Sequence, residues 1–278
     1  MCGTLSTSPL LRAGLCKTEM LEIFDHIRRD ISALDHRAVG ALAYTAFGLA
    51  CIYYLKNTET VASSLKGTNL EWFGSMIAQS PDNNLPSLAW WVGVVTVFYF
   101  VGPLVIIRRV WNADVRDFGL KLRIEPGFWK LLVACTVVML PLVYLMSLTE
   151  GFAAKYPFLR IYNIYNGESY IGRALLIWEL IYFVQFFGLE FFFRGFLVHS
   201  LKRSLGLYSI FVMTVPYCMI HFGKPPAETM AAIAAGIFLG WLSYRNGSIW
   251  LGLVLHCAVA FSMDLFALSN KGFLFPGA

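Results

Sequence analysis

Charge is what this sequence has least of. Only 14% of its 278 residues are charged and 58% are hydrophobic, whereas soluble globular proteins are about one-quarter charged. The apolar residues gather in long blocks, and the mean hydropathy is +0.62. The shortage of charge excludes an ordinary soluble domain, and the blocks indicate a membrane protein.

Several other signals are also missing. The six cysteines are scattered, with neither a CxxC pair nor zinc-finger spacing, so we interpret them as small buried apolar residues. No basic tract with interleaved aromatics lies outside the apolar blocks, so we expect no nucleic-acid partner, and the net charge of +5 is typical of cytoplasmic loops. No apolar stretch precedes residue 38, and we therefore expect no signal peptide.

Seven apolar stretches predict an all-α fold, a polytopic transmembrane helix bundle of about seven spans. A span needs about 20 apolar residues, and the fifth and sixth stretches are shorter than this. The predicted spans are Val39–Leu55, Ala89–Ile107, Gly127–Leu148, Ala174–Val198, Leu207–Ile220, Thr229–Tyr244 and Ser248–Leu268.

The segment KTEMLEIFDHIRRDISAL, residues 17–34, has a different pattern. Charged residues separate apolar residues that recur at helical spacing, which predicts an amphipathic helix. Such a helix either lies on the membrane surface or packs against the other spans. The apolar positions are Met20, Phe24, Ile27, Ile31 and Leu34.

Basic residues are concentrated in the N-terminal segment and in the loops on the same side of the predicted spans. Because cytoplasmic loops are enriched in Lys and Arg, we expect a cytoplasmic N-terminus and, after seven spans, an external C-terminus. We expect the membrane to be a bacterial inner membrane. The basic residues are Arg28, Arg29, Arg37, Arg108, Arg109, Arg116, Lys121, Arg123, Lys202, Arg203 and Arg245. We divide the chain into an N-terminal segment (1–38), a three-span part (39–173), a four-span core (174–268) and a tail (269–278).

Six ionisable residues fall inside the predicted spans, where such groups are costly and often functional. At 1.5 Å per helical residue, Glu190, His221 and His256 lie about 15, 21 and 12 Å from the cytoplasmic ends of their spans. The three can therefore share one level of the bilayer. The six residues are Glu179, Glu190, Arg194, His221, His256 and Asp264.

One carboxylate and two imidazoles allow two kinds of chemistry. They can ligate zinc, which activates water, or the carboxylate and one histidine can activate water directly while the other histidine stabilises the oxyanion. Arg194 lies one helical turn after Glu190 and can offset the cost of burying that carboxylate. Alternatively, Glu190 and Arg194 only neutralise each other and pin two helices together.

Three motifs resemble those of the CPBP family, the CaaX-protease and bacteriocin-processing endopeptidases of membranes. The first is LEFFFRG, residues 189–195, at the place of a glutamate pair, three residues and an arginine. The second is Tyr217, three residues and His221. The third is RNGSIWLGLVLHCAVA, residues 245–260, which contains His256. The resemblance covers about a third of the chain, from Ala174 to Leu268.

The resemblance implies peptide hydrolysis within the membrane, without a cofactor. In the family the first glutamate and the second-motif histidine activate water, the third-motif histidine and an asparagine hold the oxyanion, and the arginine orients the glutamates. Here Leu189 stands at the first glutamate and Ala260 at the asparagine. Glu179, on nearly the same helical face as Glu190, and Asp264, two turns after His256, are possible replacements.

We therefore predict an intramembrane endopeptidase with catalytic residues Glu190, Arg194, His221 and His256. It would cleave near the C-terminus or leader of a membrane-associated protein, with membrane lipid and a protein or peptide substrate as its partners. Two alternatives remain open: a non-catalytic relative acting as a scaffold or in bacteriocin immunity, and a transporter that uses the buried ionisable groups as a relay.

Overall fold

The computed structural model describes residues 22–78, 85–122, 126–159 and 173–272. Within these ranges the chain forms helices and no β-strand, and one antiparallel bridge joins Leu120 and Ser248. The all-α prediction is confirmed. The helices are α2 His36–Leu55, α3 Thr58–Leu65, α4 Glu71–Ala78, α5 Leu85–Thr96, α6 Gly102–Val105, α7 Phe128–Ser147, α8 Glu150–Lys155, α9 Arg173–Glu190, α10 Val198–Leu205, α11 Tyr208–Met219, α12 Pro226–Asn246 and α13 Trp250–Asn270.

Short segments of other helical types join some of these helices. The π-helices η1 (Val97–Val101) and η2 (Ile106–Val110) flank α6, and the 3₁₀-helix η3 (Val115–Phe118) follows. A third π-helix, η5 (Phe191–Leu197), joins α9 to α10. The continuous helical runs are therefore longer than the individual helices.

Six helical runs are long and apolar enough to cross a membrane, by length and composition. They are His36–Leu55, Leu85–Val110, Phe128–Ser147, Leu175–Leu205, Pro226–Asn246 and Trp250–Asn270. The fifth predicted span corresponds to α11, which has only 12 residues. At 1.5 Å per residue α11 is about 18 Å long, too short to cross alone, and its last turn leads into His221.

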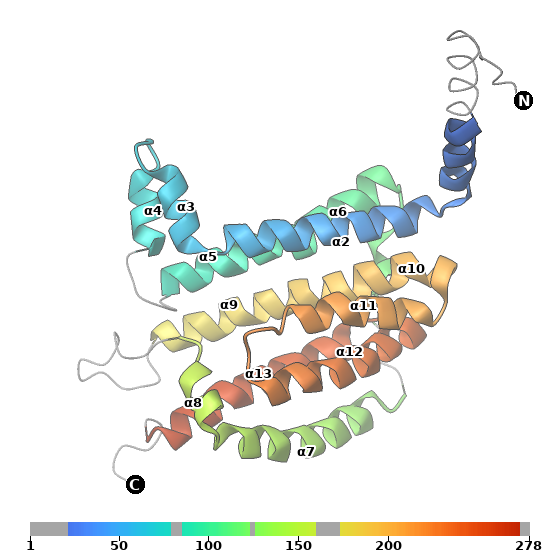
Figure 1. Ribbon diagram of the computed structural model, residues 1–278. Coiled ribbons are helices and arrows are strands. Elements are labelled where there is room, and N and C mark those ends of the chain that lie inside the picture. Colours follow the sequence, from blue (N-terminus) through green and yellow to red (C-terminus); the bar gives the residue numbers. More distant parts are fainter. Residues whose placement is uncertain (1–21, 79–84, 123–125, 160–172, 273–278) are drawn as a thin grey trace, which may run out of the picture.

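The run α9–η5–α10 occupies the middle of the bundle (Figure 1). The α2 and α5–α6 layer lies on one side, α11, α12 and α13 lie on the other, and α7 is outermost beside α13. Phe191, Phe192, Phe193 and Phe196 are completely buried. The aromatic run between Glu190 and Arg194 is therefore the centre of the protein core rather than a lipid-facing surface.

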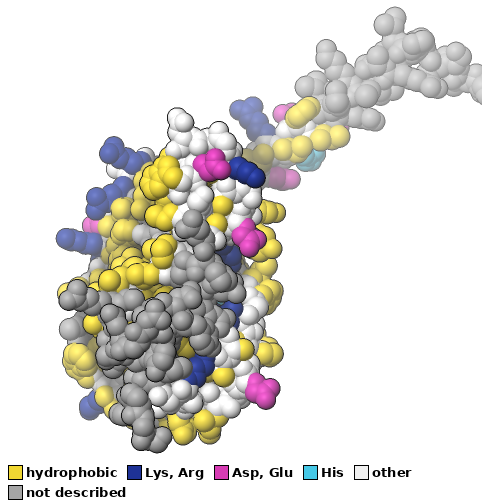
Figure 2. All heavy atoms as spheres, turned by 90° about the vertical axis from the view of Figure 1, so that its left-hand side faces the viewer, with side chains coloured by type: hydrophobic (Ala, Val, Ile, Leu, Met, Phe, Trp, Pro, Cys, Tyr) yellow, Lys and Arg dark blue, Asp and Glu magenta, His cyan; other side chains and the backbone are white. Residues whose placement is uncertain are grey.

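A close backbone approach joins η3 to this centre. A Cβ added to Gly195 would lie 2.5 Å from the Phe118 carbonyl oxygen, so only glycine allows the two segments to pack at this distance. In contrast, α7 has many exposed apolar residues, among them Val133, Val137 and Leu145. Hydrophobic side chains also line the flanks of the bundle in Figure 2, as expected for a surface in contact with lipid.

The predicted amphipathic helix is present over residues 22–33. It stands away from the bundle, ahead of α2 (Figure 1). Its apolar face is about half exposed at every described position, so the alternative in which it packs against the other spans is wrong for these residues. The exposed residues are Ile23, Phe24, Ile27, Ile31 and Leu34. Met20 lies outside the described residues, and attachment to the membrane surface stays a prediction.

Candidate functional site

Glu190 and Arg194 face each other across the junction of α9 and η5. The Arg194 Nη1 atom lies 3.1 Å from Glu190 Oε1, and both side chains are essentially inaccessible to solvent. His256 of α13 meets the same carboxylate oxygen, with its Nδ1 atom 2.9 Å from Oε1. One carboxylate oxygen therefore contacts both a cation and an imidazole, and the imidazole lies 66 positions after Glu190 in the sequence.

The contacts of His256 fix its orientation. A carboxylate oxygen only accepts hydrogen bonds, so Nδ1 carries the proton and donates it to Glu190. In the neutral ring the other nitrogen, Nε2, is then free to accept a proton. The ring of Phe186 packs against the His256 ring with centroids 4.4 Å apart. These two contacts fix the orientation of the His256 ring, and a carboxylate at Nδ1 is the arrangement that orients the histidine of a catalytic triad.

Tyr217 links Arg194 to the second histidine. The Arg194 guanidinium carbon lies 3.8 Å from the centre of the Tyr217 ring, which is a close cation–π contact. The Tyr217 carbonyl accepts a hydrogen bond of 2.8 Å from His221 Nδ1, and the two rings meet edge to face at 4.8 Å. Since Nδ1 donates here too, Nε2 of His221 is likewise the accepting nitrogen of the neutral ring.

The four predicted site residues thus belong to one connected cluster, in which the sequence predicted the contact of Glu190 with Arg194 but not the contacts made through Tyr217. Glu190 contacts Arg194 and His256, whereas His221 reaches them through Tyr217. Among the described hydrogen bonds, none joins Glu190 to His221 directly. Tyr217 was visible in the sequence only as the aromatic residue of the second motif, and nothing in that pattern assigned it a contact with Arg194.

Several buried polar atoms of the cluster have no well-aligned hydrogen bond among the described residues, although the side chains of Arg194 and Tyr217 are close enough to interact as hydrogen-bond partners. The buried atoms are Oε2 of Glu190 and all three guanidinium nitrogens of Arg194, although Nη1 is within ion-pair distance of Oε1. Buried polar atoms normally have partners. Gly252 of α13 lies against this side of the carboxylate, because an added Cβ would be 2.8 Å from Oε2. The absence of a side chain at Gly252 lets α13 approach Glu190.

The two positions that depart from the family motifs are apolar and buried. Leu189 and Ala260 are 4% and 5% exposed. Leu189 packs in the main core cluster, and Ala260 packs beside Trp178, Tyr182 and Phe186. Neither position supplies a polar group to the site.

Glu179 and Asp264 form a separate buried cluster. Asp264 accepts hydrogen bonds from the Trp178 indole nitrogen and the Phe158 backbone nitrogen, both at 3.2 Å. The carboxyl groups of Glu179 and Asp264 are also hydrogen-bond partners of each other. No described hydrogen bond joins either residue to Glu190 or His256, so neither replaces the missing motif residues by direct contact.

The residues considered as possible zinc ligands do not lie together in a metal-binding arrangement. In the part of the chain that the structure describes, no group of three or more His, Cys, Asp or Glu side chains is arranged to hold a metal ion. Glu190, His221 and His256 therefore do not form a ligand set here. The described cysteines are free and partly buried: Cys51, Cys135, Cys218 and Cys257.

Comparison with known proteins finds a similarity to one family over residues 171–262. Residues 171–262 match the family model described as "Type II CAAX prenyl endopeptidase Rce1-like". Neither a curated protein nor a solved structure matches the chain. The matched residues include Glu190, Arg194, His221 and His256. With its six apolar helices, the chain is an integral membrane protein. The resemblance predicted from the three motifs is confirmed over residues 171–262, which are similar to the Rce1-like endopeptidases of the CPBP family.

Proposed function

We propose that this protein is an intramembrane endopeptidase in which Glu190 and His256 act together to activate water. Its substrate is a membrane-associated protein or peptide, cleaved near its C-terminus or leader. The contact between Glu190 Oε1 and His256 Nδ1 carries the proposal. The family match supports peptide-bond hydrolysis within the membrane, and the reaction needs only groups that the chain itself supplies.

In the proposed reaction, His256 is the general base. Its Nε2 takes a proton from water as the oxygen attacks the carbonyl carbon of the substrate, and Glu190 stabilises the resulting imidazolium. The imidazolium then returns the proton to the leaving amine as the C–N bond breaks. His221, whose Nδ1 is committed to the Tyr217 carbonyl, uses Nε2 to accept a hydrogen bond from the attacking water and so positions it.

Glu190 itself is a poor candidate for the base. Its Oε1 is engaged by both Arg194 and His256, and an ion pair with arginine stabilises the ionised carboxylate rather than its protonated form. We assign Arg194 the role of holding Glu190 in place and ionised. This assignment explains how the chain can function with Leu189 at the first glutamate position, because the remaining carboxylate orients a histidine.

The orientation in the membrane is part of the proposal. We propose a cytoplasmic N-terminus and an external C-terminus, because the basic residues of the loops gather at one end of the bundle and because α11, although short, brings the chain back from the end of α10 toward the start of α12 (Figure 1). We also propose that the membrane is a bacterial inner membrane. Labelling single cysteines introduced at Arg109 and at Asn270 with a membrane-impermeant reagent in intact cells tests this. Only the cysteine at position 270 should react.

Substrate cleavage can be tested without knowing the substrate. Membrane-protein termini are compared in bacterial cells expressing the wild type, Glu190→Gln or His256→Gln. We expect new termini that depend on the wild type and decrease at least 100-fold in both variants, in line with the loss of a catalytic base or its orienting group. Glutamine at position 190 keeps an acceptor oxygen for Arg194, so the fold should persist, which a thermal unfolding curve in detergent checks.

The matched control is Glu179→Gln, because Glu179 lies on the same helix but outside the cluster. This variant should process substrate like the wild type. If wild-type cells show no additional termini, or if Glu190→Gln produces them at the wild-type rate, the protein is not an endopeptidase of the proposed kind. The scaffold alternative would then account better for Leu189 and Ala260.

A further inference from the structure

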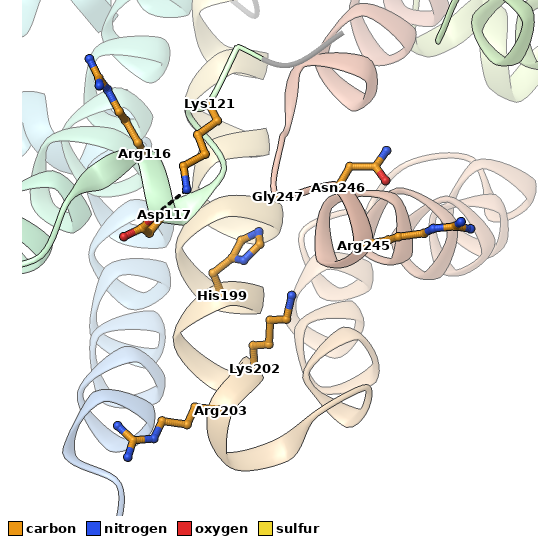
Figure 3. Close-up of a pocket in the computed structure, with 9 residues that line it drawn as sticks. All are labelled: Arg116, Asp117, Lys121, His199, Lys202, Arg203, Arg245, Asn246 and Gly247. Carbon is orange, nitrogen blue, oxygen red and sulfur yellow. Dashed lines mark hydrogen bonds and ion pairs between the residues drawn. The ribbon is translucent and has the colours of Figure 1, made fainter. Parts of the chain in front are cut away.

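A second polar feature lies at the end of the bundle where α10 and α12 terminate. It is a cavity of about 430 Å³ with five basic side chains in its lining, and we call it the basic pocket. Figure 3 shows Lys121, Lys202 and His199 projecting toward its space, while the three arginines lie at its rim with their guanidinium groups directed outward. The basic residues are Arg116, Lys121, Lys202, Arg203 and Arg245.

The positive charge of the basic pocket is largely uncompensated. Its lining contains one carboxylate, Asp117, which pairs with Lys121 at 2.7 Å. No carboxylate of the described residues lies within ion-pair distance of the other four basic side chains. These four come from segments far apart in sequence that the fold brings together. The basic pocket therefore carries a net positive charge that an anion can neutralise.

The walls of the basic pocket are fixed by the fold. Lys202 Nζ donates a 2.8 Å hydrogen bond to the Tyr244 carbonyl and lies 4.1 Å from the centre of that ring. The segment after η3 is joined to the start of α13 by the Ile249 N–H to Gly119 carbonyl hydrogen bond of 3.0 Å and by the bridge between Leu120 and Ser248. Binding an anion here would therefore need little rearrangement of the backbone.

The floor of the basic pocket contacts the Arg194 backbone. The Ser243 hydroxyl donates a 2.9 Å hydrogen bond to the Arg194 carbonyl oxygen. Because that hydroxyl hydrogen is used, Ser243 accepts the 3.2 Å hydrogen bond from His199 Nε2. A neutral His199 then has its proton on Nε2, so Nδ1 is not a donor and the cations on the walls are the groups available to an anion.

The position of the basic pocket indicates where its ligand comes from. Exposed apolar side chains reach the same end of the bundle, including Val110 at the end of η2 and Leu207 and Tyr208 before α11. An exposed tryptophan, Trp241, lies under Arg245 at 5.4 Å. Aromatic and basic residues together are typical of the headgroup level of a membrane, and basic pockets between transmembrane helices bind phosphate-bearing headgroups.

We propose that the basic pocket binds the phosphate group of an anionic phospholipid from the adjacent leaflet. Lys202 and Lys121 would contact the phosphate oxygens, and the three rim arginines would attract the anionic headgroup. This inference is independent of catalysis, because it depends on the charge, the cavity and its level in the membrane. It assigns a lipid-binding site to the end of the molecule where α10 and α12 terminate, outside the cluster of Glu190, Arg194, His221 and His256.

The test uses the full-length protein in mixed vesicles or nanodiscs that contain spin-labelled phosphatidylglycerol or spin-labelled phosphatidylcholine. We expect the protein to immobilise phosphatidylglycerol with at least tenfold preference. In Lys202→Gln/Arg245→Gln the preference should fall about tenfold or more, because each basic residue near a charged membrane surface contributes a several-fold effect. The control Arg108→Gln/Arg109→Gln removes the same charge from the same end, outside the basic pocket, and should keep the preference.

Three results would overturn the proposal. One is equal binding of the two lipids by the wild type, and another is an equal loss in the pocket and control variants, which would indicate only general surface charge. The third is displacement of the lipid by millimolar inorganic phosphate, which would identify a site for soluble anions. Because Lys202 also contacts Tyr244, Arg116→Gln/Arg203→Gln provides a second pocket variant that removes only rim arginines, and it should lose the preference as well.

Discussion

Helix α9 carries two buried carboxylates in opposite surroundings. Glu190 meets the cation of Arg194 and the imidazole of His256, whereas Glu179, eleven residues earlier, meets the carboxyl group of Asp264. Both lie in the same helix and both are less than 10% exposed. The two carboxylates differ in the side chains that contact them.

On the proposed function, this difference separates a reactive arrangement at Glu190 from a structural one at Glu179. At Glu190 the negative charge is balanced, so an ionised carboxylate can be buried and can orient a histidine. At Glu179 and Asp264 a hydrogen bond between two carboxyl groups requires a proton on one of them. Asp264 then joins α13 to Trp178 of α9 and to the backbone at Phe158, which fixes the packing of these segments.

The largest expected effect comes from removing the cation at the first carboxylate. Arg194→Met leaves Glu190 buried without its charge partner, which should decrease the free energy of unfolding by about 3–5 kcal/mol. Denaturant titration in detergent measures this. The double variant Arg194→Met/Glu190→Gln should recover part of the loss, since no charge then remains. If the single and double variants are equally unstable, the ion pair is not what stabilises this part of α9.

A substitution in the cluster of Glu179 and Asp264 should decrease the free energy of unfolding by a smaller amount. In Asp264→Asn one acceptor oxygen is replaced by an amide NH₂ group, so either Trp178 or Phe158 loses its partner. We expect a cost of about 2 kcal/mol with proteolytic processing retained, measured by the same titration and by terminus analysis. Loss of processing without loss of stability would show that this cluster belongs to the reaction.

A smaller change at Gly252 tests the close approach of α13 to Glu190. The added methyl group of Gly252→Ala must displace the carboxylate at Oε2, at a cost of about 1 kcal/mol, and should reduce processing by disturbing the contact with His256. Gly93→Ala in α5 is the matched control, because no atom lies within 4 Å of its added Cβ. Alanine there should stabilise the helix slightly and leave processing unchanged.

The smallest effect is expected at Glu179. Glu179→Gln replaces one carboxyl group by an amide that can still hydrogen-bond to Asp264, so stability should change by less than about 1 kcal/mol and processing should be retained. Measured beside Glu190→Gln, this variant compares the same chemical change at the two carboxylates. Equal losses of processing at both positions would contradict the division of α9 into a reactive and a structural part.

Hydropathy predicted most of the fold, because it reports length and polarity directly. It located α11 to within one residue at each end, as Leu207–Ile220 against the observed Tyr208–Met219, and its shortness was already visible in the apolar stretch. The amphipathic pattern of residues 22–33 predicted a helix but not its separation from the bundle, since exposure depends on the other elements.

Part of the candidate site could also be predicted from the sequence, because spacing along one helix determines which side chains are neighbours. The contact of Glu190 with Arg194 follows from their four-residue spacing on one helix, and the depth estimate allowed His256 to reach the same level. The cation–π contact with Tyr217 and the pairing of Glu179 with Asp264 depend on how helices rotate against each other. A single sequence has no pattern that reports such rotations.

The π-helical segment η5 lies between the Glu190 cluster on α9 and the part of the basic pocket on α10. The number of residues in η5 determines how these two polar regions are rotated relative to each other. A π-helix closes its hydrogen bonds one residue later than an α-helix, so it behaves like a residue inserted into a continuous helix. If the remaining turns keep their geometry, deleting one residue there turns α10 by roughly 100° relative to α9. Lys202 and His199 would then leave the basic pocket while Glu190 stayed beside His256. Over evolutionary time this segment can therefore exchange one apolar residue for another more readily than it can gain or lose a residue.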